Sequence, residues 1–135
     1  MYQQVTNKDR IDSINRIKGE LNKEDGEWWI FDNFDLGHHF VREYFIGIES
    51  WYYRAGLNNY EIVITTWDKK NWEPNKKLVM NEFKEKEKWV LEEDLSSNPN
   101  RSYYRYKMEN TTEDEIIKTL SDVCQRMKKL KFVTT

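Results

Sequence analysis

Two adjacent histidines, His38 and His39, are the residues best suited to bind a metal ion, and Asp32, Asp35 and Glu43 lie close to them in the sequence. Imidazole and carboxylate ligands suit zinc, manganese or iron, but a site needs three or four of them to converge. Neighbouring residues on a strand point to opposite faces, so the two histidines would not bind the same ion. We therefore expect a polar turn that leads into a strand, and no metal site.

An acidic residue followed two positions later by a lysine would suit a metal-dependent nuclease, in which carboxylates hold Mg²⁺ and the lysine supports the attacking water. Two such pairs, Asp68–Lys70 and Glu82–Lys84, are about what chance predicts for a chain with 24 acidic residues and 15 lysines. The five glycines are scattered, so they form neither a phosphate-binding loop nor a nucleophile turn. We expect no catalytic residue and no cofactor, and an enzyme is the least supported class.

The single cysteine, Cys124, lies beside Val123 near the apolar stripe of the last predicted helix. A buried thiol in such a position is usually inert packing. One cysteine cannot form an internal disulfide, which favours a reducing, cytoplasmic location. The first ten residues have no apolar signal-peptide core, and the longest apolar run is far below the ~18 residues that span a bilayer. The expected protein is cytoplasmic and has no membrane partner.

Residues 101–108 alternate in a way that predicts a strand with two unlike faces. One face, with Tyr104, Tyr106 and Met108, is expected to join the core. The other face combines basic side chains with one ring: Arg101, Tyr103, Arg105 and Lys107. Cations beside an aromatic ring suit single-stranded nucleic acid, which makes a nucleic-acid-binding module the alternative function. The net charge of −2 argues against a general affinity for polyanions.

Six tryptophans, eight tyrosines and six phenylalanines occur in 135 residues. An AT-rich bacterial, phage or mobile-element genome would explain part of the tyrosine and phenylalanine count, but not the tryptophans, whose codon is rich in G. Trp28 and Trp29 must point to opposite faces of a strand, and Trp72 lies in a polar stretch and should be exposed. We expect the rings that are hardest to bury to bind a partner protein: Trp28, Trp29, Trp72 and Tyr103.

The periodicity predicts two amphipathic helices, one over residues 6–23 and one that begins after Thr112, with Glu115 completing a capping box. Strands are expected at 27–31, 60–67, 89–91 and 101–108, and a short charged helix at 76–87. Residues 38–55 fit a strand or a helix, and their aromatic and β-branched side chains favour the strand. The order predicts one α+β domain, residues 1–135, in which an antiparallel sheet of about five strands packs one face on the two terminal helices.

The succession of strand, hairpin, tryptophan-led strand, tyrosine strand and closing helix resembles the C-terminal part of some proteins in the PD-(D/E)XK nuclease superfamily. The resemblance covers roughly the last two thirds of the chain and includes no motif residue, so no catalytic role follows from it. The favoured hypothesis is a non-enzymatic interaction domain that binds another protein, or a second copy of itself, through an aromatic-rich sheet surface. An accessory or inhibitory protein in a phage or bacterial defence system would fit this description.

Overall fold

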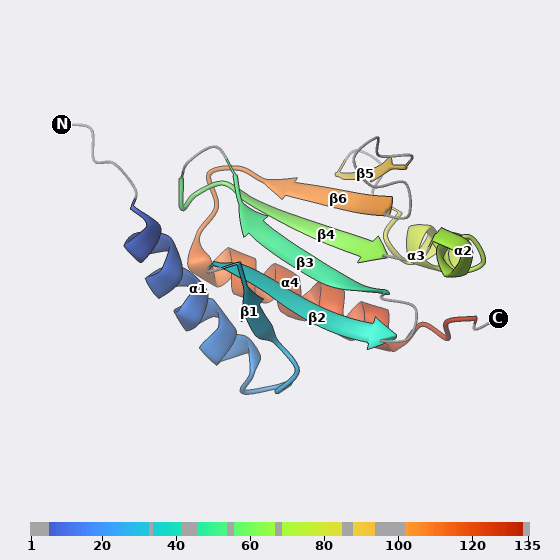
Figure 1. Cartoon of the computed structure of the whole chain (residues 1–135), viewed down its shortest axis with the longest axis horizontal. Coiled ribbons are helices and arrows are strands. Elements are labelled where there is room, and N and C mark those ends of the chain that lie inside the picture. The colour runs from blue at the N-terminus through green and yellow to red at the C-terminus, as the bar shows by residue number, and fades with distance from the viewer. Residues whose placement is uncertain are drawn as a thin grey trace.

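The computed structural model describes residues 6–32, 34–41, 46–53, 56–66, 69–84, 88–93 and 102–133, with the backbone alone at 39, 41, 69 and 71. The chain forms an α+β fold, as predicted. Its elements are, in order, α1 (Asn7–Leu21), β1 (Trp29–Phe31), β2 (Asp35–Val41), β3 (Ile46–Tyr52), β4 (Tyr60–Thr66), α2 (Lys69–Trp72), α3 (Lys76–Glu82), β5 (Trp89–Glu92), β6 (Ser102–Met108) and α4 (Glu113–Lys128) (Figure 1).

All six strands form one antiparallel sheet in the order β1-β2-β3-β4-β6-β5. The sheet has one strand more than predicted, because residues 38–55 contribute to two strands, β2 and β3, and not to one. Both are extended, which excludes the helical alternative for the described part of that segment. β2 begins at Asp35, inside the stretch that turn-forming residues had marked as a loop. Pairing with β1 on one side and β3 on the other holds those residues extended.

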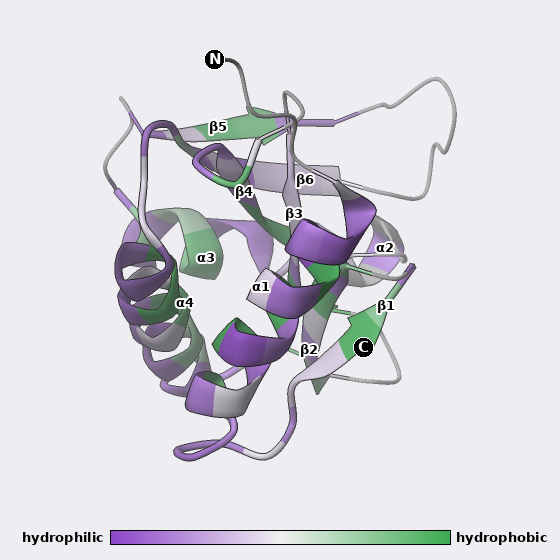
Figure 2. Cartoon of the chain, turned by 90° about the vertical axis from the view of Figure 1, so that its left-hand side faces the viewer, coloured by the Kyte–Doolittle hydropathy of each residue, from purple (hydrophilic) through white to green (hydrophobic). Residues whose placement is uncertain are grey.

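Helices α1 and α4 pack against each other on one face of the sheet (Figures 1 and 2). Each begins at a threonine. The Thr6 side chain accepts a hydrogen bond from the Asp9 backbone in a complete capping box, and the Thr112 side chain accepts one from the Glu115 backbone. Such caps satisfy backbone N–H groups that have no partner within the helix. Within the described residues, no helix has the length and apolar character needed to cross a membrane.

The apolar stripes of both helices face the sheet, as their periodicity predicted. The buried stripe of α1 includes Ile14, Ile17 and Leu21. The buried residues of α4 are Ile116, Leu120, Val123, Cys124 and Met127. Buried aromatic residues of the sheet, such as Tyr60 and Tyr104, belong to the same core. The two terminal helices therefore form one layer and the sheet the other.

The prediction that Trp72 is exposed is wrong, because its side chain is completely buried. The polar residues around it led to that prediction, but α2 and α3 place Trp72 and Phe83 in the hydrophobic core. Phe83 packs on Trp89, with ring centroids 5.0 Å apart. The Tyr104 hydroxyl donates a 2.5 Å hydrogen bond to the Phe83 carbonyl oxygen. Trp72 thus serves the core at this end of the sheet and offers no surface to a partner.

The burial of Trp72 predicts a large stability effect. Trp72→Ala should lower the free energy of unfolding by about 3–5 kcal/mol, because it leaves a cavity as well as losing apolar contacts. Val90→Ala, at a side chain that is 59% exposed, should change it by less than about 0.5 kcal/mol. Urea denaturation followed by circular dichroism would measure both. Equal effects of the two substitutions would contradict the assignment of Trp72 to the core.

Candidate functional site

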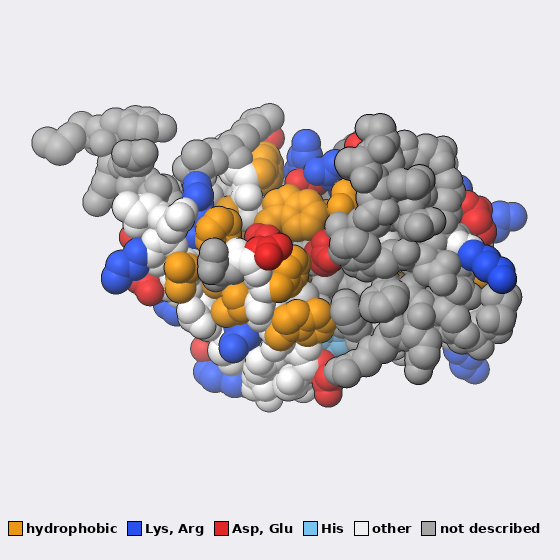
Figure 3. All heavy atoms as spheres, viewed as in Figure 1, with side chains coloured by type: hydrophobic (Ala, Val, Ile, Leu, Met, Phe, Trp, Pro, Cys, Tyr) orange, Lys and Arg blue, Asp and Glu red, His pale blue; other side chains and the backbone are white. Residues whose placement is uncertain are grey.

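The sheet face turned away from α1 and α4 is the first candidate surface, and we call it the outer face. Strand alternation places on it a set of rings, charges and one exposed aliphatic residue: Trp51, Tyr53, Glu61, Val90, Glu92, Tyr103, Arg105 and Lys107. Figure 3 looks onto this face, where hydrophobic side chains gather with carboxylates between them. The predicted division of residues 102–108 into an inner and an outer set is confirmed, since Tyr104 and Met108 are buried in the core.

A buried carboxylate organises the charges of the outer face. Glu61 on β4 is 2% exposed, and it accepts hydrogen bonds from the Trp51 indole N–H (3.2 Å) and from the Arg105 guanidinium. Arg105 also donates to Glu92 on β5. The hydrogen bond to Glu61 is the largest of the effects that raise the pKa of Arg105. Arg105 therefore joins β4, β6 and β5 and compensates a charge that could not otherwise be buried.

The rings of the outer face pack on one another and on the cations. Trp51 and Tyr103 meet edge to face with centroids 6.2 Å apart. The Arg105 guanidinium lies 5.7 Å from the Tyr103 ring centre, and the Lys107 Nζ lies 5.7 Å from that of Tyr53. Aromatic rings and cations at these separations attract each other. Tyr103 and Lys107 are thus on one surface, as the sequence predicted, while Arg101 lies outside the described residues.

The two adjacent tryptophans separate, as expected for neighbours at a strand. Trp28 is 4% exposed and packs edge to face on His38, with centroids 5.0 Å apart, so it does not reach the surface. Trp29 is half-buried and lies over Gly37, where a Cβ would be 3.1 Å from its ring. Glycine suits that position because two rings of β1 approach its backbone closely, and a Cβ there would require them to shift. Of this pair, only Trp29 can contribute to a partner contact.

A hollow of about 550 Å³ opens along β5 and β6 at the edge of the outer face. It is lined by Lys88, Val90, Glu92, Arg105, Tyr106 and Lys107. Val90 stands out among these residues, because it is a large aliphatic side chain that is 59% exposed. The lining combines three basic residues with one acidic residue, so the hollow is apolar at Val90 and cationic around it.

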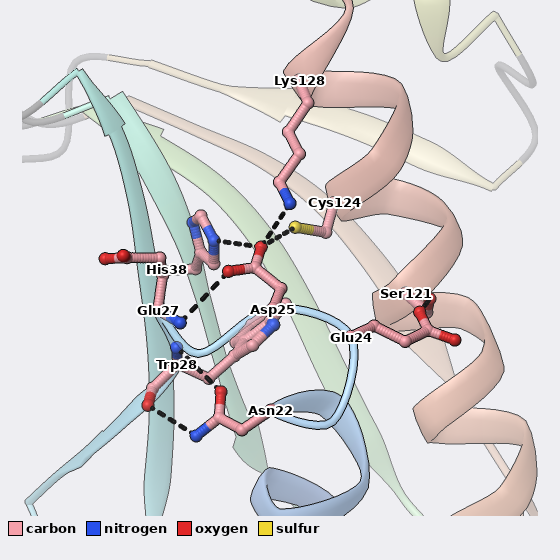
Figure 4. Close-up of polar contacts among 9 residues, drawn as sticks. All are labelled: Asn22, Glu24, Asp25, Glu27, Trp28, His38, Ser121, Cys124 and Lys128. Carbon is pink, nitrogen blue, oxygen red and sulfur yellow. Dashed lines mark hydrogen bonds and ion pairs between the residues drawn. The ribbon is translucent and has the colours of Figure 1, made fainter.

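A second candidate site is a buried polar cluster between the sheet and α4, drawn in Figure 4. Asp25 lies in the loop after α1, His38 on β2, and Cys124 and Lys128 on α4. The Oδ2 atom of Asp25 is 2.9 Å from His38 Nε2, 3.5 Å from Cys124 Sγ and 2.6 Å from Lys128 Nζ. Its Oδ1 atom accepts a 3.1 Å hydrogen bond from the Glu27 backbone. One carboxylate thus connects three parts of the fold.

The charges of this cluster favour an ionised Asp25 and a protonated Cys124. Burial by itself would raise the pKa of Asp25, but the hydrogen bonds from Lys128 and His38 outweigh it and lower the pKa to about 2. Burial, together with the hydrogen bond to Asp25, raises the pKa of the Cys124 thiol to about 12. A protonated thiol is a poor nucleophile, and the aspartate, not the histidine, contacts the sulfur. This arrangement does not suit nucleophilic catalysis.

The sequence did not indicate this cluster. It singled out His38 for its neighbours Asp32 and Asp35, whereas the structure pairs His38 with Asp25 and Cys124. Asp25 sits in a polar loop without any local signal, and its partner Cys124 is 99 positions away. Glu43, Asp68 and the side chain of His39 lie outside the described residues. The prediction that Cys124 is buried is confirmed by its 2% exposure.

Asp35 is a further carboxylate with a displaced pKa. Burial, and then the nearby charges of Asp32 and Glu49, raise its pKa to about 6. Ionisation of Asp35 is therefore unfavourable in the folded protein. The negative charges of Asp32 and Glu49 repel the ionised form of Asp35.

The ion pairs of the outer face lead to a test by substitution. Arg105→Ala should lower the free energy of unfolding by about 3 kcal/mol or more, because it leaves the Glu61 charge buried without its partner. The double variant Glu61→Gln/Arg105→Ala should regain part of that loss, since no buried charge remains. Lys107→Ala, at an exposed position of the same strand, should cost less than about 1 kcal/mol. Chemical denaturation would measure the free energy of unfolding of the parent and the three variants. A double variant less stable than Arg105→Ala would contradict the role of Arg105 as the partner of the buried Glu61 charge.

The displaced pKa of Asp35 predicts a pH dependence of stability. Asp35 binds its proton more tightly in the folded state (pKa about 6) than in the unfolded state (about 4). Its contribution to stability is therefore complete below about pH 4 and is lost as the pH rises through about 6. Asp35→Asn cannot ionise, so it should become more stable relative to the parent protein over that interval. Thermal melting at pH 4, 5, 6 and 7 measures the difference, and a constant difference would disprove the assignment.

Searches against protein-family models, curated proteins and solved structures found no match to this chain. The chemistry of its surfaces and clusters is therefore the basis for inferring its function.

Proposed function

We propose that this protein is a non-enzymatic binding domain and that its outer face is the contact surface for another protein. The observation that carries the proposal is the exposure of Val90, 59%, at the rim of the hollow along β5 and β6. An exposed aliphatic side chain beside aromatic and basic residues at the rim of a concave surface is consistent with an interaction site. α1 and α4 occupy the opposite face of the sheet, and neither helix lines the hollow beside Val90.

The residue types around Val90 support a protein partner. Tryptophan, tyrosine and arginine provide most of the binding energy in many protein interfaces, and Trp51, Tyr103 and Arg105 are neighbours on the outer face. These side chains are already held by one another and by Glu61. These side chains would therefore lose little conformational entropy when a partner binds. The outer face is preorganised for binding in this sense.

The charges of the hollow indicate the chemistry of the partner. Lys88 and Lys107 are exposed cations of its lining, and Glu92 is already paired with Arg105. A complementary segment would place an apolar side chain on Val90 and acidic residues beside the two lysines. β5 is at the edge of the sheet, where an extended segment can add as a further strand. The proposed partner is therefore a protein with an extended, acidic segment that contains an apolar residue.

Nucleic acid fits the same surface less well. Arg105, the central cation of the predicted basic strand, donates to Glu61 and Glu92, so its guanidinium is committed to carboxylates. Carboxylates on both sides of it would also repel phosphate groups. A binder of single strands needs a continuous cationic path along the backbone, and the described residues of the outer face alternate in charge. The nucleic-acid module remains the alternative that the same experiment must exclude.

Affinity capture with matched variants tests the proposal. Four tagged proteins would be incubated with host lysate: the parent, Val90→Asp, Lys107→Glu and the control Lys118→Glu. Lys118 is exposed on α4. Mass spectrometry would identify the proteins that each one binds. We expect a protein that is bound by the parent and by Lys118→Glu. Its affinity for Val90→Asp and Lys107→Glu should be at least about tenfold weaker, because each introduces a negative charge into the contact.

Three outcomes would contradict the proposal. One is a bound protein whose affinity is unchanged in Val90→Asp and Lys107→Glu. A second is binding of a single-stranded oligonucleotide that weakens steeply with salt and is lost in Lys107→Glu, which would establish the nucleic-acid alternative. The third is a dimer of the parent protein in light scattering that Val90→Asp converts to a monomer, since the occupant of the outer face would then be a second copy of the chain.

A further inference from the structure

We propose that Asp25, His38 and Cys124 form a binding site for a divalent transition-metal ion of the zinc type. The three side chains offer a carboxylate oxygen, an imidazole nitrogen and a sulfur whose positions all lie within 4.8 Å of one another. Oxygen, nitrogen and thiolate sulfur are the three ligand types that zinc binds in proteins. The site lies between β2 and α4, on the opposite side of the sheet from the outer face, so it does not depend on the proposed binding function.

Two of the three ligand separations are close to those of tetrahedral coordination, and the third, between His38 and Cys124, is at most 4.8 Å. With bonds of about 2.0 Å to oxygen and nitrogen and about 2.3 Å to sulfur, tetrahedral ligand atoms are about 3.2–3.6 Å apart. Asp25 Oδ2 is 3.5 Å from Cys124 Sγ, which meets that requirement without movement. The same oxygen is 2.9 Å from His38 Nε2, so these two atoms need to separate by only a few tenths of an ångström. The three atoms would occupy one face of the tetrahedron and leave the fourth position for water.

The surroundings hold the ligands in the required orientation. The Glu27 backbone N–H binds Asp25 Oδ1 and leaves Oδ2 directed at His38 and Cys124 (Figure 4). His38 is 3% exposed, and its ring lies between those of Trp28 and Phe40. The ring centroids are 5.0 Å apart for Trp28 and 4.5 Å apart for Phe40. Groups behind the ligands that fix their orientation, with an apolar shell around them, strengthen metal binding.

Lys128 shows that this position already favours a cation. Its ammonium group is 2.6 Å from Asp25 Oδ2, and its side chain is 41% exposed, so it can move into solvent when a metal ion takes its place. Metal binding would release the proton of the Cys124 thiol, and His38 would bind the ion through an Nε2 atom that carries no hydrogen. The dication then neutralises the carboxylate and the thiolate, and no unpaired charge is buried. Lys128 is therefore a built-in competitor for the metal.

Titration of the purified, tag-free protein with Co²⁺, followed by competition with Zn²⁺, tests the site. Because Cys124 is the only cysteine in the sequence, a thiolate-to-cobalt charge-transfer band in the near ultraviolet would by itself identify it as a ligand. We expect one equivalent of Co²⁺ to produce that band and Zn²⁺ to abolish it. Lys128→Gln should bind Co²⁺ at least about tenfold more tightly, whereas its matched control Lys129→Gln should bind it as the parent does.

Two further variants make the result decisive. Cys124→Ser should lose the band, and His38→Gln should weaken Co²⁺ binding about tenfold or more, with circular dichroism to confirm that each variant is folded. Absence of the band in both the parent and Lys128→Gln would overturn the proposal. So would tight Co²⁺ binding without the band, since the metal would then be held elsewhere on the protein.

Discussion

The ionised carboxylate of Asp25 is the interaction on which the packing of the helix layer depends. It is nearly enclosed, with 7% of its side chain exposed, and a buried charge is tolerated only when hydrogen bonds and opposite charges surround it. Those partners come from β2 and from α4, so the charge is compensated only when both elements are in their native positions. The contacts of Cys124 and Lys128 with one oxygen tie α4 to the loop that follows α1.

The outer face follows the same principle with a second buried carboxylate. Glu61 is compensated by Arg105 and Trp51, which join three strands side by side. A consequence for function is that the most prominent cation of the predicted basic strand serves the fold. The parts of that face left for a partner are the rings of Trp51 and Tyr103 and the exposed aliphatic group of Val90. This arrangement supports the proposal of a protein partner over that of a polyanion.

Most of the fold could be predicted from local patterns, and the errors have a common cause. Helices α1 and α4 follow from their apolar periodicity and threonine caps, and the two faces of β6 follow from alternation. The exposure of Trp72 was mispredicted because the polar residues beside it describe its neighbours in the chain, not those in space. The additional strand arose because residues 38–55 form two paired strands, β2 and β3, where one was predicted. Both depend on contacts that local sequence does not encode.

The positions of the aromatic residues also depend partly on local sequence and partly on tertiary contacts. Alternation was sufficient to place Tyr103 and Lys107 on one surface and Tyr104 beneath it, because the direction of a side chain on a strand depends only on the residue's own position. By itself, then, the sequence determined most of the elements and which face of a strand each side chain takes. Only the tertiary structure decided that Asp25, His38 and Cys124 meet at one point, because they come from elements as much as 99 positions apart and are brought together by the packing of α4 on the sheet.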